Sequence, residues 1–305
     1  MRRLLVLAVA LFTLFAVARL WSRQTGEPPV LSVRTELVTL TVAVVDRHGG
    51  FVTGLRRDQF TVYDGGTPQP IEFFSGGNVP ATVGLLIDNS YSMHGRHDDI
   101  VQAAMAFVRM RGPADELFVL NFNDSIWTTA PVDIPRPANE QQLRAALAAR
   151  PPRGMTAVYD AVLYGLARLD WGVPDRRALI LVSDGGDNNS RWGAEDVLQR
   201  ARRGDAAIYP VTFYDPDNQD ARPAVLKSLA DATGGQVMTA RRPADATREF
   251  VRIADAIRSS YAIGFAPAPS AGGFRPIRVV VDGGDRQLTA RTRAGYYAAP
   301  ATAAR

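Results

Sequence analysis

The chain has 305 residues, of which 46% are hydrophobic and 22% are charged, a balance typical of a globular protein of about two domains and not of a disordered chain. It contains no cysteine, which excludes disulfides, thiolate metal sites and cysteine nucleophiles. The formal net charge is +4, and +2 without residues 1–18. The arginines form no basic stripe with interleaved aromatic residues, so the composition gives no support to nucleic-acid binding.

The first residues have the pattern of a secretory signal. Arg2 and Arg3 precede an apolar stretch over residues 4–18, whose last three residues, Ala-Val-Ala, are typical of a cleavage site. The stretch is shorter than the roughly 20 residues of a membrane span. We therefore expect a cleaved signal over residues 1–18, with an uncleaved anchor as the alternative and the only membrane contact. The protein is expected to be exported, to a periplasm, a cell envelope or the medium.

Residues 31–79 are expected to form an N-terminal β segment after a polar linker over residues 19–30. The stretch 37–45 is rich in β-branched residues and places apolar side chains at every second position, which is typical of a strand. A second short strand is expected over 60–63, before the Asp-Gly-Gly turn at residues 64–66. No helical period appears before about residue 96, so this part of the chain is β-rich.

The middle of the chain, residues 80–257, alternates strands with helices. Strands are expected over residues 84–87, 117–122, 178–182, 207–213 and 236–239, and helices around 100–108, 143–147, 158–169, 194–203, 223–232 and 245–258. The run Ala-Leu-Ile-Leu-Val at 178–182 is continuously apolar, as in a parallel strand covered on both faces. The alternation predicts an α/β fold with a doubly wound, mostly parallel sheet between two layers of helices. Pro210 interrupts one expected strand and indicates a bulge or an edge position.

After residue 257 the sequence returns to strands. Residues 258–299 contain stretches of alternating apolar and polar residues separated by Gly- and Pro-rich turns, and residues 300–305 are a tail. The two β segments are each too small for a good core of their own. We therefore expect them to pair into one β-sandwich with the α/β domain inserted between them. Two separate β appendages are the alternative.

Oxygen-bearing side chains gather where the expected α/β strands end. Asp88, Ser90 and Ser92 follow the strand at 84–87, Asp184 follows the strand at 178–182, and Thr156 lies at the start of the helix at 158–169. Taken alone, residues 88–92 favour a turn over a metal site, because Asp and Ser bond their own backbone. Ligands of an open parallel sheet bind outside the carboxyl ends of its strands, so we expect the five side chains to converge. Hard cations prefer such oxygen ligands.

These motifs, in this order, resemble the metal-ion-dependent adhesion site of von Willebrand factor A domains. The resemblance rests on the D-x-S-x-S run at 88–92, the threonine of "GMTA" and the aspartate of "SDG", and it covers residues 81–256. The flanking segments look like the β segments that accompany this domain in exported bacterial proteins. The resemblance implies that Ser90 and Ser92 bind a divalent cation directly, Thr156 directly or through water, and Asp88 and Asp184 largely through bridging waters.

The implied cation is Mg²⁺, with Ca²⁺ or Mn²⁺ as alternatives. Two carboxylates roughly neutralise a 2+ ion, whereas neutral hydroxyls leave it electrophilic, so a carboxylate from a protein partner can replace one of its waters. The predicted function is therefore an exported, metal-dependent protein-binding or adhesion module that captures an acidic residue of its partner. The alternative is a structural subunit of a cell-envelope complex, in which the metal mainly stabilises the loops.

An enzyme is not expected. The chain has no G-x-S-x-G, G-x-G-x-x-G or H-E-x-x-H motif. Ser90 beside Asp88 is a remote candidate for a hydrolase nucleophile, but no recognised motif supplies the histidine or lysine base that activates a serine. Residues 187–189 are expected to form a solvated loop rather than to support the site. Tyr91 and Met93 flank the site, and each either contacts a partner or packs inward.

Overall fold

The computed structural model describes residues 37–77, 79–129, 135–136, 139–213, 222–268 and 272–298. The predicted signal at 1–18, the linker at 19–30 and the tail at 300–305 lie outside the described residues. Within the described part of the chain, no helix is both long enough and apolar enough to cross a membrane.

A six-stranded sheet forms the middle of the chain, with the strand order β10-β9-β8-β5-β6-β7. Its strands are β5 (Ala81–Asp88), β6 (Glu116–Phe122), β7 (Ile126–Thr128), β8 (Arg176–Val182), β9 (Ala207–Phe213) and β10 (Met238–Ala240). All neighbours pair in parallel except β6 and β7, which are antiparallel. β5 and β9 are buried along their whole length, as expected for parallel strands covered on both faces. The predicted mostly parallel sheet is confirmed.

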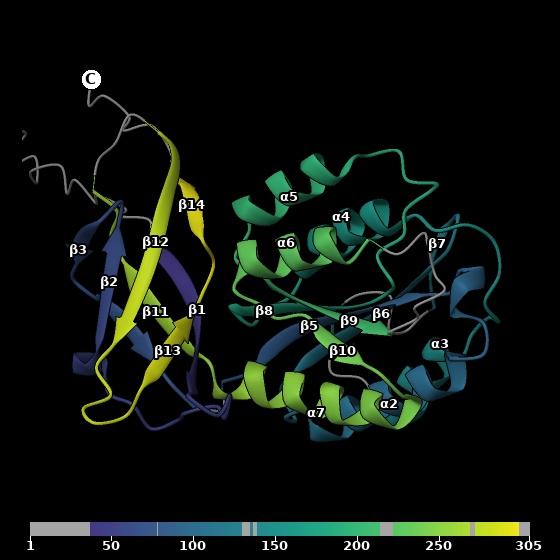
Figure 1. Cartoon of the computed structure of the whole chain (residues 1–305), viewed down its shortest axis with the longest axis horizontal. Helices are drawn as coiled ribbons and strands as arrows, with labels where there is room; N and C mark the ends of the chain where they lie inside the picture. Colours follow the sequence, from purple (N-terminus) through teal and green to yellow (C-terminus); the bar gives the residue numbers. More distant parts are fainter. Residues whose placement is uncertain are drawn as a thin grey trace, which may run out of the picture. The chain divides into compact units, whose positions relative to one another are not determined.

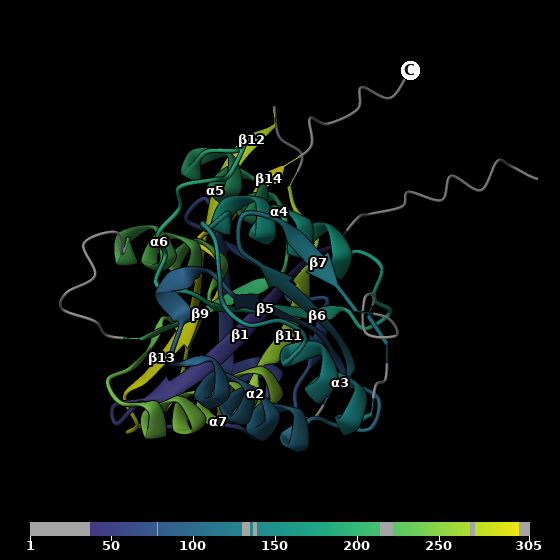
Figure 2. The same cartoon turned by 90° about the vertical axis from the view of Figure 1, so that its right-hand side faces the viewer.

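Helices cover both faces of this sheet (Figures 1 and 2). They are α2 (His97–Met110), α3 (Glu140–Leu147), α4 (Val158–Leu169), α5 (Ala194–Arg203), α6 (Pro223–Thr233) and α7 (Pro243–Ser259). The apolar stripes of α2, α3 and α7 share one core with the sheet residues Leu85 and Ile87. The stripes of α4, α5 and α6 share a second core with Leu86 on the opposite face. Because side chains alternate along a strand, successive residues of β5 serve the two cores, and the sheet is doubly wound.

The winding of the sheet reverses at β5. The chain runs from β5 to β6 on one side and later returns to β8 on the other side of β5. Binding sites of open α/β sheets lie at such a reversal, outside the carboxyl ends of the strands. The carboxyl end of β5 is Asp88, so the topology points to the predicted constellation.

Pro210 lies in an interior strand rather than an edge strand, because β9 is flanked by β8 and β10. The carbonyl of Val211 accepts the N–H of Ser183, the residue after β8, so Val211 faces β8 and its neighbour Pro210 faces the side of β10. β10 is short and first pairs with β9 at Val211. Pro210 therefore lies just before the hydrogen bonds between β9 and β10 begin, so its missing N–H leaves no gap in them. The predicted edge position is wrong for β9 as a strand, but at Pro210 itself the side toward β10 is unpaired, as it would be at an edge.

The two β segments form a single sandwich. One sheet has the order β13-β1-β11-β4 and the other β14-β12-β2-β3. The strands are β1 (Val38–Asp46), β2 (Phe60–Asp64), β3 (Thr67–Gln69), β4 (Phe73–Ser75), β11 (Tyr261–Phe265), β12 (Gly273–Val281), β13 (Leu288–Arg291) and β14 (Gly295–Ala298). Each sheet contains strands from both segments, since β1 pairs with β11 and β13, and β2 pairs with β12. One apolar core unites the two sheets, which confirms the predicted sandwich.

A buried carboxylate ties the two segments of the sandwich together. Asp64, at the end of β2, accepts a hydrogen bond from Nε of Arg275 at 2.8 Å and from the hydroxyl of Tyr296 at 3.0 Å. Burial is the largest cause that raises the pKa of Tyr296, to about 12. Each of the two carboxylate oxygens of Asp64 accepts one of these hydrogen bonds, as a buried charge requires.

Arg176 joins the sandwich to the α/β sheet. Residues 37–298 belong to one compact unit, and Arg176, at the start of β8, is only 3% exposed. Its guanidinium donates to the carbonyls of Gly77 at 3.3 Å and Val79 at 3.1 Å in the incoming connection. It also donates to Ile257 at 3.1 Å and Ser260 at 2.8 Å in the outgoing one. The side chain of Arg176 is thus hydrogen-bonded to both of the segments that connect the β-sandwich to the α/β domain.

Candidate metal site

The first part of the site is the loop that leaves β5. Asp88 is fully buried; its Oδ1 accepts the backbone N–H of Ser90 at 2.8 Å and its Oδ2 accepts the hydroxyl of Ser183 at 2.8 Å. Burial raises the pKa of Asp88 to about 7. The short helix η2 (Tyr91–Met93) then turns the chain and leaves the hydroxyl oxygens of Ser90 and Ser92 3.1 Å apart.

The second part is the loop before α4, which ends in Thr156. The backbone N–H of Arg153 donates to the carbonyl of Asn89 at 2.7 Å, and that of Tyr91 donates to the carbonyl of Gly154 at 3.1 Å. Gly154 has a φ of +78°, a conformation that is costly for other residues. The glycine of "GMTA" therefore lets this loop lie against the β5 loop, and Thr156, which is 6% exposed, lines the same pocket as Ser90.

The third part follows β8. Asp184 is 6% exposed, and its Oδ1 accepts the N–H of Gly186 at 2.9 Å. Ser183 precedes it, donates to Asp88, and accepts the N–H of Gly185 at 3.1 Å. Ser183 thus connects the ends of the adjacent strands β5 and β8, a role that its position alone did not predict.

These loops enclose a pocket of about 240 Å³. It is lined by Ser90, Tyr91, Ser92, Gly154, Thr156, Asp184, Gly186, Asp187, Asn188 and Arg222. Four of the five predicted site residues line it directly, and the fifth, Asp88, lies behind it in hydrogen-bond contact with Ser90. The structure therefore brings the predicted side chains together.

The donor set of this pocket suits a divalent cation. Two carboxylates supply charge and three hydroxyls supply neutral oxygen atoms, the ligand type that Mg²⁺ and Ca²⁺ prefer. Among the described residues, no group of three or more His, Cys, Asp and Glu side chains could hold a metal ion. A cation bound here would depend on the hydroxyls of Ser90, Ser92 and Thr156.

Residues 187–189 are solvated in part, as predicted: Asn188 is exposed, and Asp187 and Asn189 are half-buried. Asp187 and Asn188 nevertheless also hold the backbone around Thr156. Oδ1 of Asn188 accepts the backbone N–H of Thr156 at 2.8 Å, and its own N–H donates to the carbonyl of Thr156 at 3.0 Å. Oδ2 of Asp187 accepts the N–H of Tyr159 at 3.0 Å in the first turn of α4, which satisfies a donor that a helix start leaves open. The sequence carries no signal for these contacts, because their partners are about 30 residues away.

A buried asparagine network was also missed. Nδ2 of Asn89 donates to Oδ1 of Asn121 at 2.9 Å, and Nδ2 of Asn121 donates to the carbonyl of Ala146 at 2.9 Å. Nδ2 of Asn123 donates to the carbonyl of Arg153 at 2.9 Å. The sequence feature that could have indicated this network was the position of Asn121 inside an otherwise apolar strand. Together these bonds hold the backbone of the site loops.

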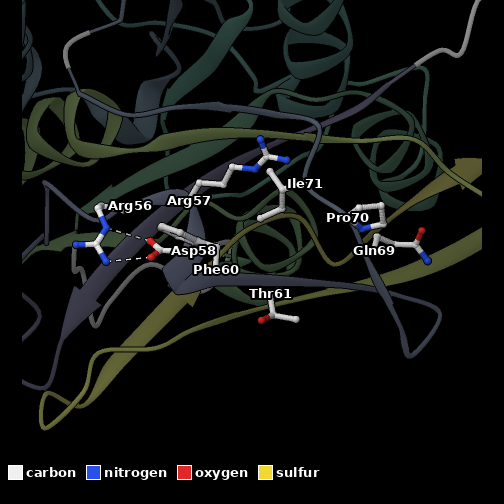
Figure 3. Close-up of a pocket in the computed structure, with 8 residues that line it drawn as sticks. All are labelled: Arg56, Arg57, Asp58, Phe60, Thr61, Gln69, Pro70 and Ile71. Atoms are coloured by element: carbon white, nitrogen blue, oxygen red, sulfur yellow. Dashed lines mark hydrogen bonds and ion pairs between the residues drawn. The ribbon is translucent and has the colours of Figure 1, made fainter.

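A second concavity lies on the sandwich (Figure 3). It has a volume of about 660 Å³ and is lined by Arg56, Arg57, Asp58, Phe60, Thr61, Gln69, Pro70 and Ile71. The carboxylate in its lining, Asp58, is paired with Arg56 at 2.9 Å on the exposed rim. This groove lacks the convergent oxygen donors of the smaller pocket, which is therefore the stronger candidate for a functional site.

The fold and the site define the class of this protein. It is a doubly wound, Rossmann-like α/β domain with an oxygen-lined pocket at the carboxyl ends of its central strands, inserted into a β-sandwich. The profile of the von Willebrand factor type A domain matches residues 83–252, more than half of the 305-residue chain. The chain belongs to the von Willebrand factor type A domain family.

Solved structures share this fold at low sequence identity. A von Willebrand factor type A protein from Catenulispora acidiphila is 14% identical with a TM-score of 0.53, over 77% of this chain and 72% of that one. Proximal thread matrix protein 1 from the mussel byssus is 13% identical with a TM-score of 0.52, over 64% of this chain and 51% of its own length. Such identities establish the fold alone. A comparison with curated proteins gives no match.

Proposed function

We propose that this protein is an exported, metal-dependent protein-binding module. One observation carries the proposal: side chains from three separate loops meet in one pocket of about 240 Å³ at the carboxyl ends of β5 and β8. Their oxygen donors suit Mg²⁺, or alternatively Ca²⁺ or Mn²⁺. Export rests on the predicted signal at residues 1–18 and is part of the proposal.

Each side chain has a defined task in this proposal. Ser90, Ser92 and Thr156 hold the cation through neutral hydroxyls, while Asp88 and Asp184 supply negative charge from the buried ends of β5 and β8. A bound Mg²⁺ would supply a Lewis-acidic centre with a position open to an acidic residue of the partner. The asparagines and Ser183 keep the donors in place, and such outer contacts commonly affect metal affinity 10- to 100-fold.

A binding role is favoured over a purely structural metal. Backbone and side-chain hydrogen bonds already join the loops, from Arg153 to Asn89, from Tyr91 to Gly154 and from Ser183 to Asp88. These bonds hold the loops together through groups other than the proposed metal ligands, which supports a role for the cation in recognition. Domains of this family are commonly interaction modules, and we propose no enzymatic activity for this one.

Two experiments on the chain from residue 19 test this proposal. Calorimetric titration with Mg²⁺ measures cation binding, and a pull-down from envelope extract with and without EDTA measures capture of a partner. We expect one bound cation per chain and a partner that is captured only with the metal present. Asp231→Ala is the matched control, because Asp231 is an exposed carboxylate of α6, paired with Lys227. Capture that is equal with and without EDTA would reject the metal-dependent mechanism.

A further inference from the structure

Two exposed apolar side chains stand beside the candidate pocket. Tyr91 is 74% exposed and lines the pocket, and Met155 is 48% exposed between Gly154 and Thr156, which also line it. Tyr91 and Met93 are both part of η2, but Met93 is fully buried in the core. The structure therefore decides which of the two flanking residues faces solvent.

The backbone under both side chains is held firmly. The N–H of Tyr91 donates to the carbonyl of Gly154 at 3.1 Å, so the two loops are joined at the positions that carry the exposed residues. The next residue after Met155, Thr156, is bonded on both its N–H and its carbonyl by Asn188. The ring of Tyr91 stacks on that of His94 with centroids 6.1 Å apart. Exposed aromatic and methionine side chains on a well-held backbone next to a polar pocket are typical of protein-binding surfaces.

We propose that Tyr91 and Met155 form an apolar shelf that selects the partner, which carries an apolar side chain within two positions of its acidic residue. This inference rests on the proposed function, because the acidic residue occupies the metal pocket and the shelf adjoins that pocket. Extended residues rise about 3.3 Å each, so a neighbour one or two positions away stays beside the pocket. Burial of its apolar surface on the shelf then adds affinity.

A set of blocked pentapeptides tests the shelf. The parent has one aspartate among glycines, and four derivatives carry one leucine one or two positions before or after the aspartate. Affinities are measured by NMR titration of the chain from residue 19, with Mg²⁺ and with EDTA. We expect at least one leucine peptide to bind about tenfold more tightly than the parent, the gain from burying a few apolar groups.

Substitutions locate the preference. Tyr91→Ser and Met155→Ser together should reduce the ratio of leucine-peptide to parent affinity to less than about twofold, while melting curves check that the variant folds. Tyr164→Ser is the control, because Tyr164 is also exposed but lies in α4; it should leave the ratio unchanged. The expected changes follow from the apolar area removed.

The outcomes separate the two proposals. Mg²⁺-dependent binding with equal affinity for all five peptides overturns the shelf and leaves the metal-dependent binding function in place. A leucine preference that survives the double substitution also overturns the shelf. Absence of Mg²⁺-dependent binding for every peptide, in a protein that does not bind Mg²⁺ in calorimetry, overturns the proposed function and the shelf together.

Discussion

Asp64 of the sandwich and Asp88 of the α/β domain are both buried carboxylates at the end of a strand, but their hydrogen-bond partners differ in charge. Asp64 in the sandwich is 1% exposed and is bonded to the guanidinium of Arg275 and the hydroxyl of Tyr296. Asp88 is fully buried and is bonded to the backbone N–H of Ser90 and the hydroxyl of Ser183. Within the described residues, no cationic side chain pairs with Asp88.

This difference separates a structural carboxylate from one suited to ligand binding. The negative charge of Asp64 is balanced by the guanidinium of Arg275, so Asp64 does not require a bound cation. The charge of Asp88 is hydrogen-bonded but not balanced, and burial raises its pKa to about 7. A divalent cation from outside would balance the charge and lower that pKa, since a nearby opposite charge favours the ionised form. Four predictions test this contrast.

The largest effect is expected in the sandwich. Asp64→Ala leaves the half-buried guanidinium of Arg275 without its carboxylate and the buried hydroxyl of Tyr296 without its acceptor, which together should lower the free energy of unfolding by about 3 kcal/mol. Urea denaturation measures this change. Asp58→Ala is the control, because its ion pair with Arg56 is exposed, and it should leave stability nearly unchanged. Equal effects of the two substitutions would contradict a structural role for Asp64.

Metal binding should stabilise the folded protein through the α/β domain. With Mg²⁺ at about 100 times its Kd, the free energy of unfolding should rise by about 2.7 kcal/mol, because the cation binds the folded state alone. Asp88→Ala should abolish this gain, whereas Asp231→Ala should retain it. Thermal melting in Mg²⁺ and in EDTA is the measurement. Identical melting curves of the native protein in Mg²⁺ and in EDTA would contradict the proposal that a cation balances the charge of Asp88.

A smaller effect is expected at the second carboxylate of the site. Asp184→Ala should fold normally but weaken both Mg²⁺ binding and capture of the partner recovered from envelope extract by about 10- to 100-fold, as outer ligands commonly do. Calorimetry and surface plasmon resonance give the two affinities. Unchanged partner affinity in a protein whose Mg²⁺ affinity has fallen would favour the purely structural metal.

The smallest effect is expected at Asn188. Asn188→Ala removes the acceptor for the backbone N–H of Thr156, which should cost about 1 kcal/mol of stability and reduce Mg²⁺ affinity by less than Asp184→Ala does. Gln102→Ala, on the exposed side of α2, is the control and should change neither quantity. If both variants behave as the native protein does, the Thr156 loop is held by its other contacts.

Much of the architecture could be read from local patterns. Continuously apolar runs such as residues 178–182 identified parallel strands, and helical spacing identified α2 and α4, because burial on two faces or on one stripe imposes those periods. The candidate site could also be predicted from the sequence, since Asp88 and Asp184 follow apolar strands whose carboxyl ends lie together in a doubly wound sheet.

Contacts between distant segments could not be read in this way. Asn188 is bonded to Thr156 across 32 residues, and Asp64 to Arg275 across 211; a single sequence shows the residues but not the pairing. The position of Pro210 depended on where the short strand β10 begins. The exposure of Tyr91 and the burial of Met93 depended on η2, a three-residue turn without a strong sequence signal.

The sequence by itself determined the order of the parallel strands and the helices of the α/β domain, its class and the five oxygen-bearing residues at the strand ends, but not the short strand β7. These features follow from periodicity and from the rule that strand ends of a parallel sheet meet at one edge. Only the tertiary structure decided which strands of the two β segments pair, which polar side chains hold the loops, and which flanking residue faces solvent. Those outcomes arise from contacts between segments far apart in the chain, and the free energy of such contacts depends on packing that no local pattern records.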